Sequence, residues 1–202
     1  MVTRALQQRA QPVPESAERR ASSRVRTVYL IVKATRASDA GLFRARNISD
    51  DGIMVVAHVP FETGERVSID LSDTLAAEGT VEWCEDGCCG IRFDHPIDSA
   101  AFLRSLGEEK RERRRAACRL AVKRLATSYS ECGIRAVTIT DVSPHGVGLV
   151  HNGSLKAGVV VQLVLESGLT RSGAVCWSRD GHAGVRLAEP FTHEELESAC
   201  AL

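Results

Sequence analysis

The sequence predicts a mainly β chain built from two tandem β-barrels, each followed by a short C-terminal helix. Two observations lead to this fold class. The second half of the 202-residue chain repeats the first at an offset of 94 residues, and a fixed internal period marks duplicated structural units. Each half also contains six short apolar segments separated by turn signals, which is the pattern of a small all-β domain. Length alone allows one large domain or two small ones, so the repeat decides between them.

Residues that are rare in the chain match between the two halves at the same offset. The chain has two tryptophans, Trp83 and Trp177, and the same 94 positions that separate them relate many other matches. At an offset of 95, the segment 19–24 (RRASSR) also meets 114–119 (RRAACR). We therefore predict a disordered tail at 1–18, a first domain at 19–107 and a second domain at 108–202 that includes its own N-terminal arginine linker. The matching pairs are Asn47 with Asp141, Ser49 with Ser143, Gly52 with Gly146, Gly64 with Gly158, Gly79 with Gly173, Val81 with Val175, Gly90 with Gly184, Arg92 with Arg186 and Pro96 with Pro190.

Period-two alternation places the strands. In the first copy, Val28, Leu30 and Val32 alternate with residues that face the other way. The Asp86-Gly87 pair is a strong hairpin signal. The predicted strands are 28–33, 42–48, 52–57, 66–71, 79–83 and 90–93 in the first copy, and 120–125, 135–141, 146–150, 159–165, 173–177 and 184–187 in the second.

Each copy ends in a helix signal. Asp98 can cap a helix over 99–106, in which Phe102 begins an apolar stripe. Near the C-terminus, Thr192 and Glu195 have the spacing of a capping box, which predicts a second short helix.

The two tryptophans occupy equivalent strand positions, each two residues after a valine. We interpret each ring as filling the interior of a small barrel, with its N–H bonded at the rim. Stacking of the ring on a ligand is the alternative.

The charge balance argues against a nucleic-acid partner. Lys+Arg and Asp+Glu each total 26, whereas binding to a polymer of phosphates depends on an excess of basic side chains. Arginines nevertheless cluster within 19–26 and 111–119. Local basic sites on a neutral protein favour a small anionic ligand.

Composition also bears on compartment and metal content. No segment is long and apolar enough for membrane insertion, and residues 1–18 lack the apolar core of a signal peptide, so we expect a cytoplasmic protein. Seven cysteines, an odd number without framework spacing, indicate reduced thiols. Cys84, Cys88 and Cys89 lie close together, but no further ligand pair follows at zinc spacing, so we expect no metal and no cofactor.

Two motifs occur in the same order in both copies. Arginines four residues apart, with a further arginine in front, precede the first strand, and their guanidinium forks match phosphate oxygens and the O6/N7 edge of guanine. An Asn/Asp-x-Ser-x-x-Gly turn follows the second strand. Its carboxylate can accept from guanine N1–H and N2–H₂, its serine can bond a base edge or phosphate, and its glycine permits a tight reversal. The predicted ligand-binding residues are Arg19, Arg20, Arg24, Asn47, Ser49 and Gly52 in the first copy, and Arg114, Arg115, Arg119, Asp141, Ser143 and Gly146 in the second.

Either motif alone is usually structural, because exposed arginines are solvated and such turns bond their own backbone. Their repetition in both copies favours a binding site. The first copy resembles a PilZ domain in its segments RRASSR at 19–24, NISDDG at 47–52 and GIRF at 90–93. The second copy resembles another PilZ domain in its segments RRAACR, DVSPHG and GVRL.

This resemblance implies six-stranded antiparallel barrels that bind cyclic di-GMP, with the arginine segment wrapping around the ligand. It implies that the arginines hold phosphates and guanine edges, while the Asn or Asp and the Ser contact guanine from the barrel surface. The first copy has Asn47 where Asp is common in the family, so we nominate it as the weaker site.

The predicted function is a cyclic di-GMP receptor that signals by domain rearrangement or through a protein effector partner. The alternative is a PilZ-like protein-interaction module in which one or both copies no longer bind nucleotide. We do not expect an enzyme, because the six histidines are scattered and no catalytic arrangement of Ser, His and Asp is present.

Overall fold

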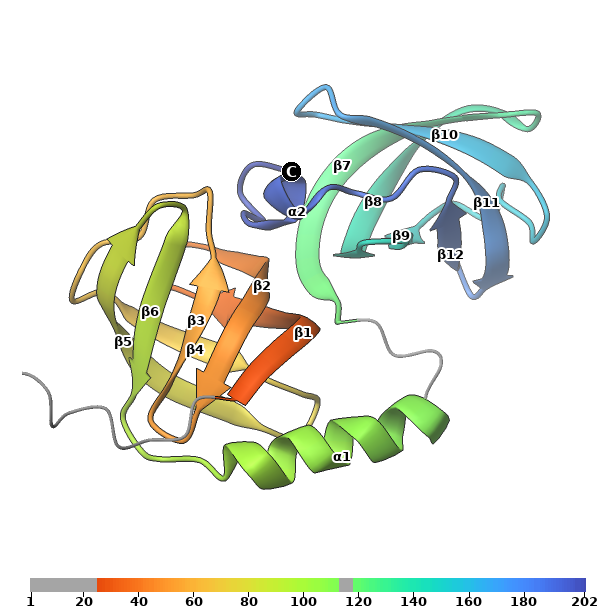
Figure 1. Ribbon diagram of the computed structural model, residues 1–202. Coiled ribbons are helices and arrows are strands. Elements are labelled where there is room, and N and C mark those ends of the chain that lie inside the picture. The colour runs from red at the N-terminus through yellow and green to blue at the C-terminus, as the bar shows by residue number, and fades with distance from the viewer. Residues whose placement is uncertain (1–24, 113–117) are drawn as a thin grey trace, which may run out of the picture.

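The structure, a computed structural model, describes residues 25–112 and 118–202, with side chains at 30–106 and from 118 onward. These residues form two closed six-stranded antiparallel barrels, which confirms the predicted fold class (Figure 1). The tail predicted at 1–18 lies outside the described residues. In pairing order, the first barrel is β1 (Val25–Thr35), β2 (Ala40–Ser49), β3 (Gly52–Val56), β6 (Cys88–Phe93), β5 (Ala76–Glu85) and β4 (Arg66–Asp70), and the second is β10 (Val160–Leu165), β11 (Thr170–Arg179), β12 (His182–Leu187), β9 (Gly146–Val150), β8 (Gly133–Ser143) and β7 (Leu120–Ser130).

Each predicted strand is present, and the duplication extends to the pairing register. Ile31 pairs with Arg44 in the first barrel, and Leu125 pairs with Thr138 in the second. Both pairs obey the offset of 94, so the two barrels can be compared position by position. The Asp86-Gly87 hairpin is confirmed, because these residues have φ values of 49° and 70°, the left-handed geometry that a two-residue hairpin turn needs.

Aliphatic side chains make up most of both barrel cores, and Phe43, Phe61 and Phe93 also pack in the first. Ile48 and Ile69 are fully buried in the first barrel, and Ile139 is fully buried in the second. Leu42 is the exception to this division: it belongs to the first barrel but packs with the core of the second. The outer face of β2 is therefore part of the contact between the barrels.

Both predicted helices are present. α1 (Ser99–Glu112) is capped by Asp98, whose Oδ1 accepts from the Ala101 backbone N–H at 2.7 Å. This helix passes the predicted end at 106 and the domain boundary proposed at 107. α2 (His193–Leu196) has the predicted capping box between Thr192 and Glu195. Among the described residues, no helix has the length and apolar character required to span a bilayer.

The interior position predicted for the tryptophans is wrong. Trp83 is 39% exposed and Trp177 is 48% exposed. A β-bulge falls between Val81 and Trp83 and again between Val175 and Trp177, and a bulge inserts one extra residue that reverses the alternation of faces. The valines therefore point into the barrels, while the rings lie on the outer surface.

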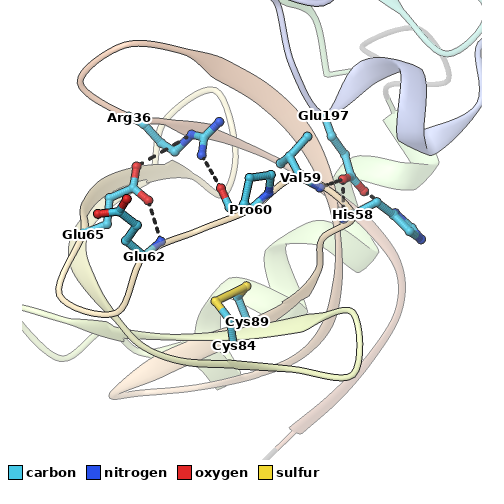
Figure 2. The surroundings of a disulfide bond; sticks show 9 residues. All are labelled: Arg36, His58, Val59, Pro60, Glu62, Glu65, Cys84, Cys89 and Glu197. Carbon is cyan, nitrogen blue, oxygen red and sulfur yellow. Dashed lines mark hydrogen bonds and ion pairs between the residues drawn. A yellow bond between two sulfur atoms is a disulfide. The ribbon is translucent and has the colours of Figure 1, made fainter.

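The expectation of reduced thiols is wrong for one pair of cysteines. Cys84 and Cys89 form a disulfide across the β5–β6 hairpin (Figure 2). The strand register places these two residues directly opposite each other, which the sequence spacing alone does not reveal. Cys88, Cys118, Cys132, Cys176 and Cys200 are free thiols.

The C-terminal segment, defined here as residues 193–202, lies between the two barrels (Figure 1). Its backbone pairs with the first barrel where Ala199 N–H donates to Ala40 O at 2.7 Å. Gly41 permits this approach, because a Cβ there would lie 2.0 Å from Glu197 O. On the other side, the Arg124 guanidinium of β7 donates to Ala199 O at 2.8 Å. The segment thus holds the outer face of β1 and β2 against the second barrel.

Two carboxylates anchor this segment. Asp39 accepts from Ser198 Oγ at 2.5 Å and from Cys200 N–H at 3.1 Å. Burial alone would raise the pKa of Asp39, but the hydrogen bonds from Ser198, Ala40 and Cys200 outweigh it, so this pKa is lowered.

Glu197 is the second anchor, and its side chain is only 1% exposed. Its Oε2 accepts from the backbone N–H groups of His58 at 2.6 Å and Val59 at 3.1 Å. Its Oε1 lies 2.9 Å from His58 Nδ1 (Figure 2). The hydrogen bond and the charge of Glu197 raise the pKa of His58, because both favour the imidazolium.

Candidate ligand-binding surface

The repeated turn joins β2 to β3 and β8 to β9, and its serine closes it in both barrels. Ser49 Oγ donates to Gly52 O at 3.3 Å, and Ser143 Oγ donates to Gly146 O at 3.2 Å. Ser143 is 4% exposed. In this structure the serines therefore shape the turn from within.

The turn glycines allow close packing against the neighbouring strand. Neither Gly52 nor Gly146 is among the glycines with positive φ, so the reversal does not need their conformational freedom. A Cβ on Gly52 would lie 2.5 Å from Ile91 O of the neighbouring β6, and one on Gly146 would lie 3.2 Å from Val185 O of β12. The absence of a side chain lets adjacent strands approach at this point.

Asp141 and Arg119 come together on the second barrel. Arg119, just before β7, forms an ion pair with the Asp141 carboxylate, which also accepts from Thr140 Oγ1 at 3.1 Å. The Asp141 side chain is 27% exposed and lies across β9, because a Cβ on Gly148 would be only 2.0 Å from Asp141 Oδ2. The structure thus joins one predicted arginine to the predicted acid above a glycine.

A tryptophan adjoins this pair. Gly148 pairs with Gly184, and Gly184 pairs with Trp177. The indole ring lies over Gly184, since a Cβ there would be 2.1 Å from Trp177 Nε1. Across β8, β9, β12 and β11 the outer surface therefore presents a carboxylate, two adjacent glycines and an exposed aromatic ring.

Arg186 adds a cation to the same surface. It lies on β12 two residues beyond Gly184 and pairs with Gly146 of the turn. Within the described ranges, no ion pair engages it. Phosphate and guanine edges both bind such a guanidinium fork.

The first barrel departs from this arrangement at three positions. Asn47 replaces Asp141, and Met54 stands where Gly148 lies in the second barrel. The third difference concerns Arg92, the counterpart of Arg186, whose Nε donates to Glu82 at 2.6 Å. The first barrel keeps the Trp83 ring over Gly90, but it offers less room and less unpaired charge.

Of the predicted ligand arginines, the structure places only Arg119. Arg19, Arg20, Arg24, Arg114 and Arg115 lie outside the described residues.

Sequence reasoning did not include Gly148 and Arg186 among the candidate residues, and it gave ligand stacking by Trp177 only as an alternative. The repeat identified Trp177 and Arg186 as matched positions, but only the bulge and the strand pairing show that they share a surface with Asp141. Gly148 has no glycine at its counterpart, Met54, so the repeat could not reveal it.

Comparisons with known proteins identify a family for the first barrel. The protein-family model for the PilZ domain matches residues 18–108. A comparison with curated proteins finds no match. Similar solved structures include the PlzA protein of Borreliella burgdorferi in complex with c-di-GMP (12% identity, 83% of this chain and 85% of that chain, TM-score 0.38). Others are the Bacillus subtilis inhibitor of motility MotI/DgrA (12% identity, 83% and 91%, TM-score 0.34) and Escherichia coli YcgR in complex with c-di-GMP (11% identity, 80% and 75%, TM-score 0.30).

Fold and surface together define a tandem-barrel protein whose two barrels carry the same turn motif in the same strand register. Residues 18–108 match the family model of the PilZ domain, and a second barrel of the same strand order follows them.

Proposed function

We propose that the protein is a receptor for cyclic di-GMP and that the second barrel holds the stronger site. The observation that carries this proposal is the Arg119–Asp141 ion pair beside Trp177, above adjacent glycines. It places an acceptor, an aromatic face and a cation on one open surface. The PilZ match at residues 18–108 and the repeated arginine segments support the same ligand class.

The chemistry of binding follows from these groups. Guanine offers N1–H and N2–H₂ as parallel donors, and a carboxylate accepts both. In the structure the Arg119 guanidinium already engages this carboxylate, because its Nη1 donates to Asp141 Oδ1 in a charge-assisted hydrogen bond. Guanine would therefore take the place of Arg119 on Asp141, and the released arginine would be free to bind a phosphate.

The remaining groups complete the site. The exposed Trp177 ring can stack on a base, a contact worth about 1–3 kcal/mol per base. Arg186 would supply a further fork, and Arg114 and Arg115 would approach from the segment before β7. The serine would contribute by holding the turn that positions Asp141.

Three features rank the sites. Asn47 accepts a hydrogen bond but carries no charge, and Met54 occupies the space that lets Asp141 lie flat. With Arg92 already bonded to Glu82, the first barrel should bind cyclic di-GMP more weakly.

Isothermal titration calorimetry with cyclic di-GMP tests the proposal. The double variant R115A/R119A should abolish binding at the second site only, and R20A/R24A should affect only the first. Each variant is checked by its thermal transition. A folded wild-type protein that gives no binding heat at tens of micromolar ligand would refute receptor function.

A further inference from the structure

One outer face of the second barrel, formed by β7, β8, β9 and β10, is unusually apolar, and the ten residues that define it carry no charge. We define this outer face by ten residues on adjacent strands: Leu125, Thr127, Tyr129, Ile134, Ala136, Thr138, Val150, Val160, Gln162 and Val164. Strand pairing makes it continuous, since β8 and β10 both pair with β7, and β9 pairs with β8. Seven large hydrophobic residues are exposed in the described part of the chain, and five of them lie here.

The exposed fractions on this face are large. Ile134 is 61% exposed, Val160 68% and Leu125 56%. Tyr129 and Val150 are exposed to 42% and 37%. Single exposed hydrophobic residues are common on protein surfaces, but a contiguous cluster indicates an interaction site.

In the first barrel, charged or covered residues stand at positions equivalent to those of the outer face. At the register positions of Thr127 and Val164, it carries Lys33 and Asp70, which form an ion pair at 2.6 Å. At the position of Val160 it carries Arg66, which is bonded to Asp94. Two ion pairs in one copy therefore correspond to apolar or uncharged residues in the other.

Two further counterparts lie in the contact between the barrels. Ala40 and Leu42 match Ile134 and Ala136, and the C-terminal segment covers them so fully that Leu42 is 1% exposed. This sheet face thus already packs against a barrel of the same fold within one chain. The equivalent face of the second barrel carries larger apolar side chains. Among the described residues, no segment packs over it.

We propose that this outer face is a self-association surface, on which two copies of the chain pack face to face. A charge-free sheet face meets its own copy without like-charge repulsion, whereas a strongly acidic or basic partner would find no complementary charge on it. Two copies related by a two-fold axis bury the same patch on both sides. The continuous sheet also provides a surface of the kind that packs in β-sandwiches.

The test compares the sedimentation of full-length variants in the absence of nucleotide. The double variant T127K/V164D places the Lys33–Asp70 pair of the first barrel at its register equivalent, so the fold has a precedent for it. The matched control T35K/S68E introduces an opposite-charge pair at facing positions of β1 and β4. Both variants are first compared with the wild type by circular dichroism and thermal melting.

Wild-type protein should move from the 21.9 kDa of one chain toward twice that mass as its concentration rises from about 1 µM to about 200 µM. T127K/V164D should raise the dimer dissociation constant by about 100-fold or more, because a symmetric interface contains each charge twice. T35K/S68E should behave like the wild type. If T127K/V164D does not fold, I134K replaces it, since Ile134 is mostly exposed at a strand end.

Two outcomes overturn the proposal. One is a wild-type chain that stays monomeric over the whole concentration range; if it also sediments with phosphatidylcholine vesicles, the face binds lipid. The other is a dimer that folded T127K/V164D leaves unchanged, which would place the interface elsewhere.

Discussion

Replacing Glu197 with alanine should weaken the contact between the barrels more than any other single carboxylate change in the C-terminal segment. The Glu197 side chain is 1% exposed and accepts two backbone N–H groups and the His58 ring. Its removal leaves the His58 and Val59 N–H groups without their acceptor. A stranded donor costs about 1–3 kcal/mol, so two would cost about 2–6 kcal/mol if water were excluded. Because His58 itself is exposed, water can replace part of the loss, and we expect about 2 kcal/mol.

Equilibrium urea unfolding measures this loss, which corresponds to a decrease of about 1 M in the midpoint for a slope near 2 kcal/mol/M. Glu194 is the matched control. It lies on α2, for which Glu197 is the C-cap residue, but its side chain is 69% exposed and its contact with His58 is long, at 3.6 Å. E194A should therefore change the free energy of unfolding by no more than about 0.5 kcal/mol. If E197A and E194A shift the midpoint equally, the buried carboxylate does not hold the barrels together.

Three further predictions follow from the same geometry. The contact between the barrels should be most stable between the lowered pKa of Asp39 and the raised pKa of His58. The contribution of Asp39 is lost as the pH falls through its folded-state pKa, and that of His58 is lost as the pH rises through its own. Urea midpoints measured across pH should show both slopes, and D39N and H58A should each remove one. W177A should weaken cyclic di-GMP binding by about 1–3 kcal/mol in calorimetry, while W83A should have a smaller effect on the total heat; equal effects would contradict the ranking of the sites. G148A should also weaken binding, because its Cβ would occupy the position of the Asp141 carboxylate, whereas M54A in the first barrel should not, and unchanged binding by G148A would show that the carboxylate position is unimportant.

The strands could be predicted because period-two alternation is a local signal, and the repeat presents that signal in both halves of the chain. Asp86-Gly87 specified its hairpin in the same local way, and Asp98 specified the start of α1. The direction of Trp83 could not be predicted by counting, because one bulge residue reverses every later side chain on a strand. The Cys84–Cys89 pairing likewise depends on a register that the sequence does not state.

Contacts between distant segments left no signal in the sequence. Glu197 and His58 are 139 positions apart, and neither belongs to a motif or a repeat. Glutamate at a helix end is usually exposed, yet Glu197 is buried against the first barrel. Motif spacing marked both members of the Arg119–Asp141 ion pair, whereas the position of Gly148 beside them becomes visible only when β8 lies beside β9.

The position of Arg119 connects the proposed ligand site to the contact between the barrels. Arg119 immediately precedes β7, and Arg124 on the same strand holds Ala199 O of the C-terminal segment. β7 has a register shift between Ala121 and Arg124, so the strand is irregular between these two arginines. A ligand that displaces Arg119 from Asp141 would therefore act on the irregular start of a strand that also fixes the neighbouring barrel. Under the proposed function, R124A separates the two events: ligand affinity at the second barrel should persist, while the ligand-induced change in the arrangement of the two barrels, measured by small-angle X-ray scattering, should be lost.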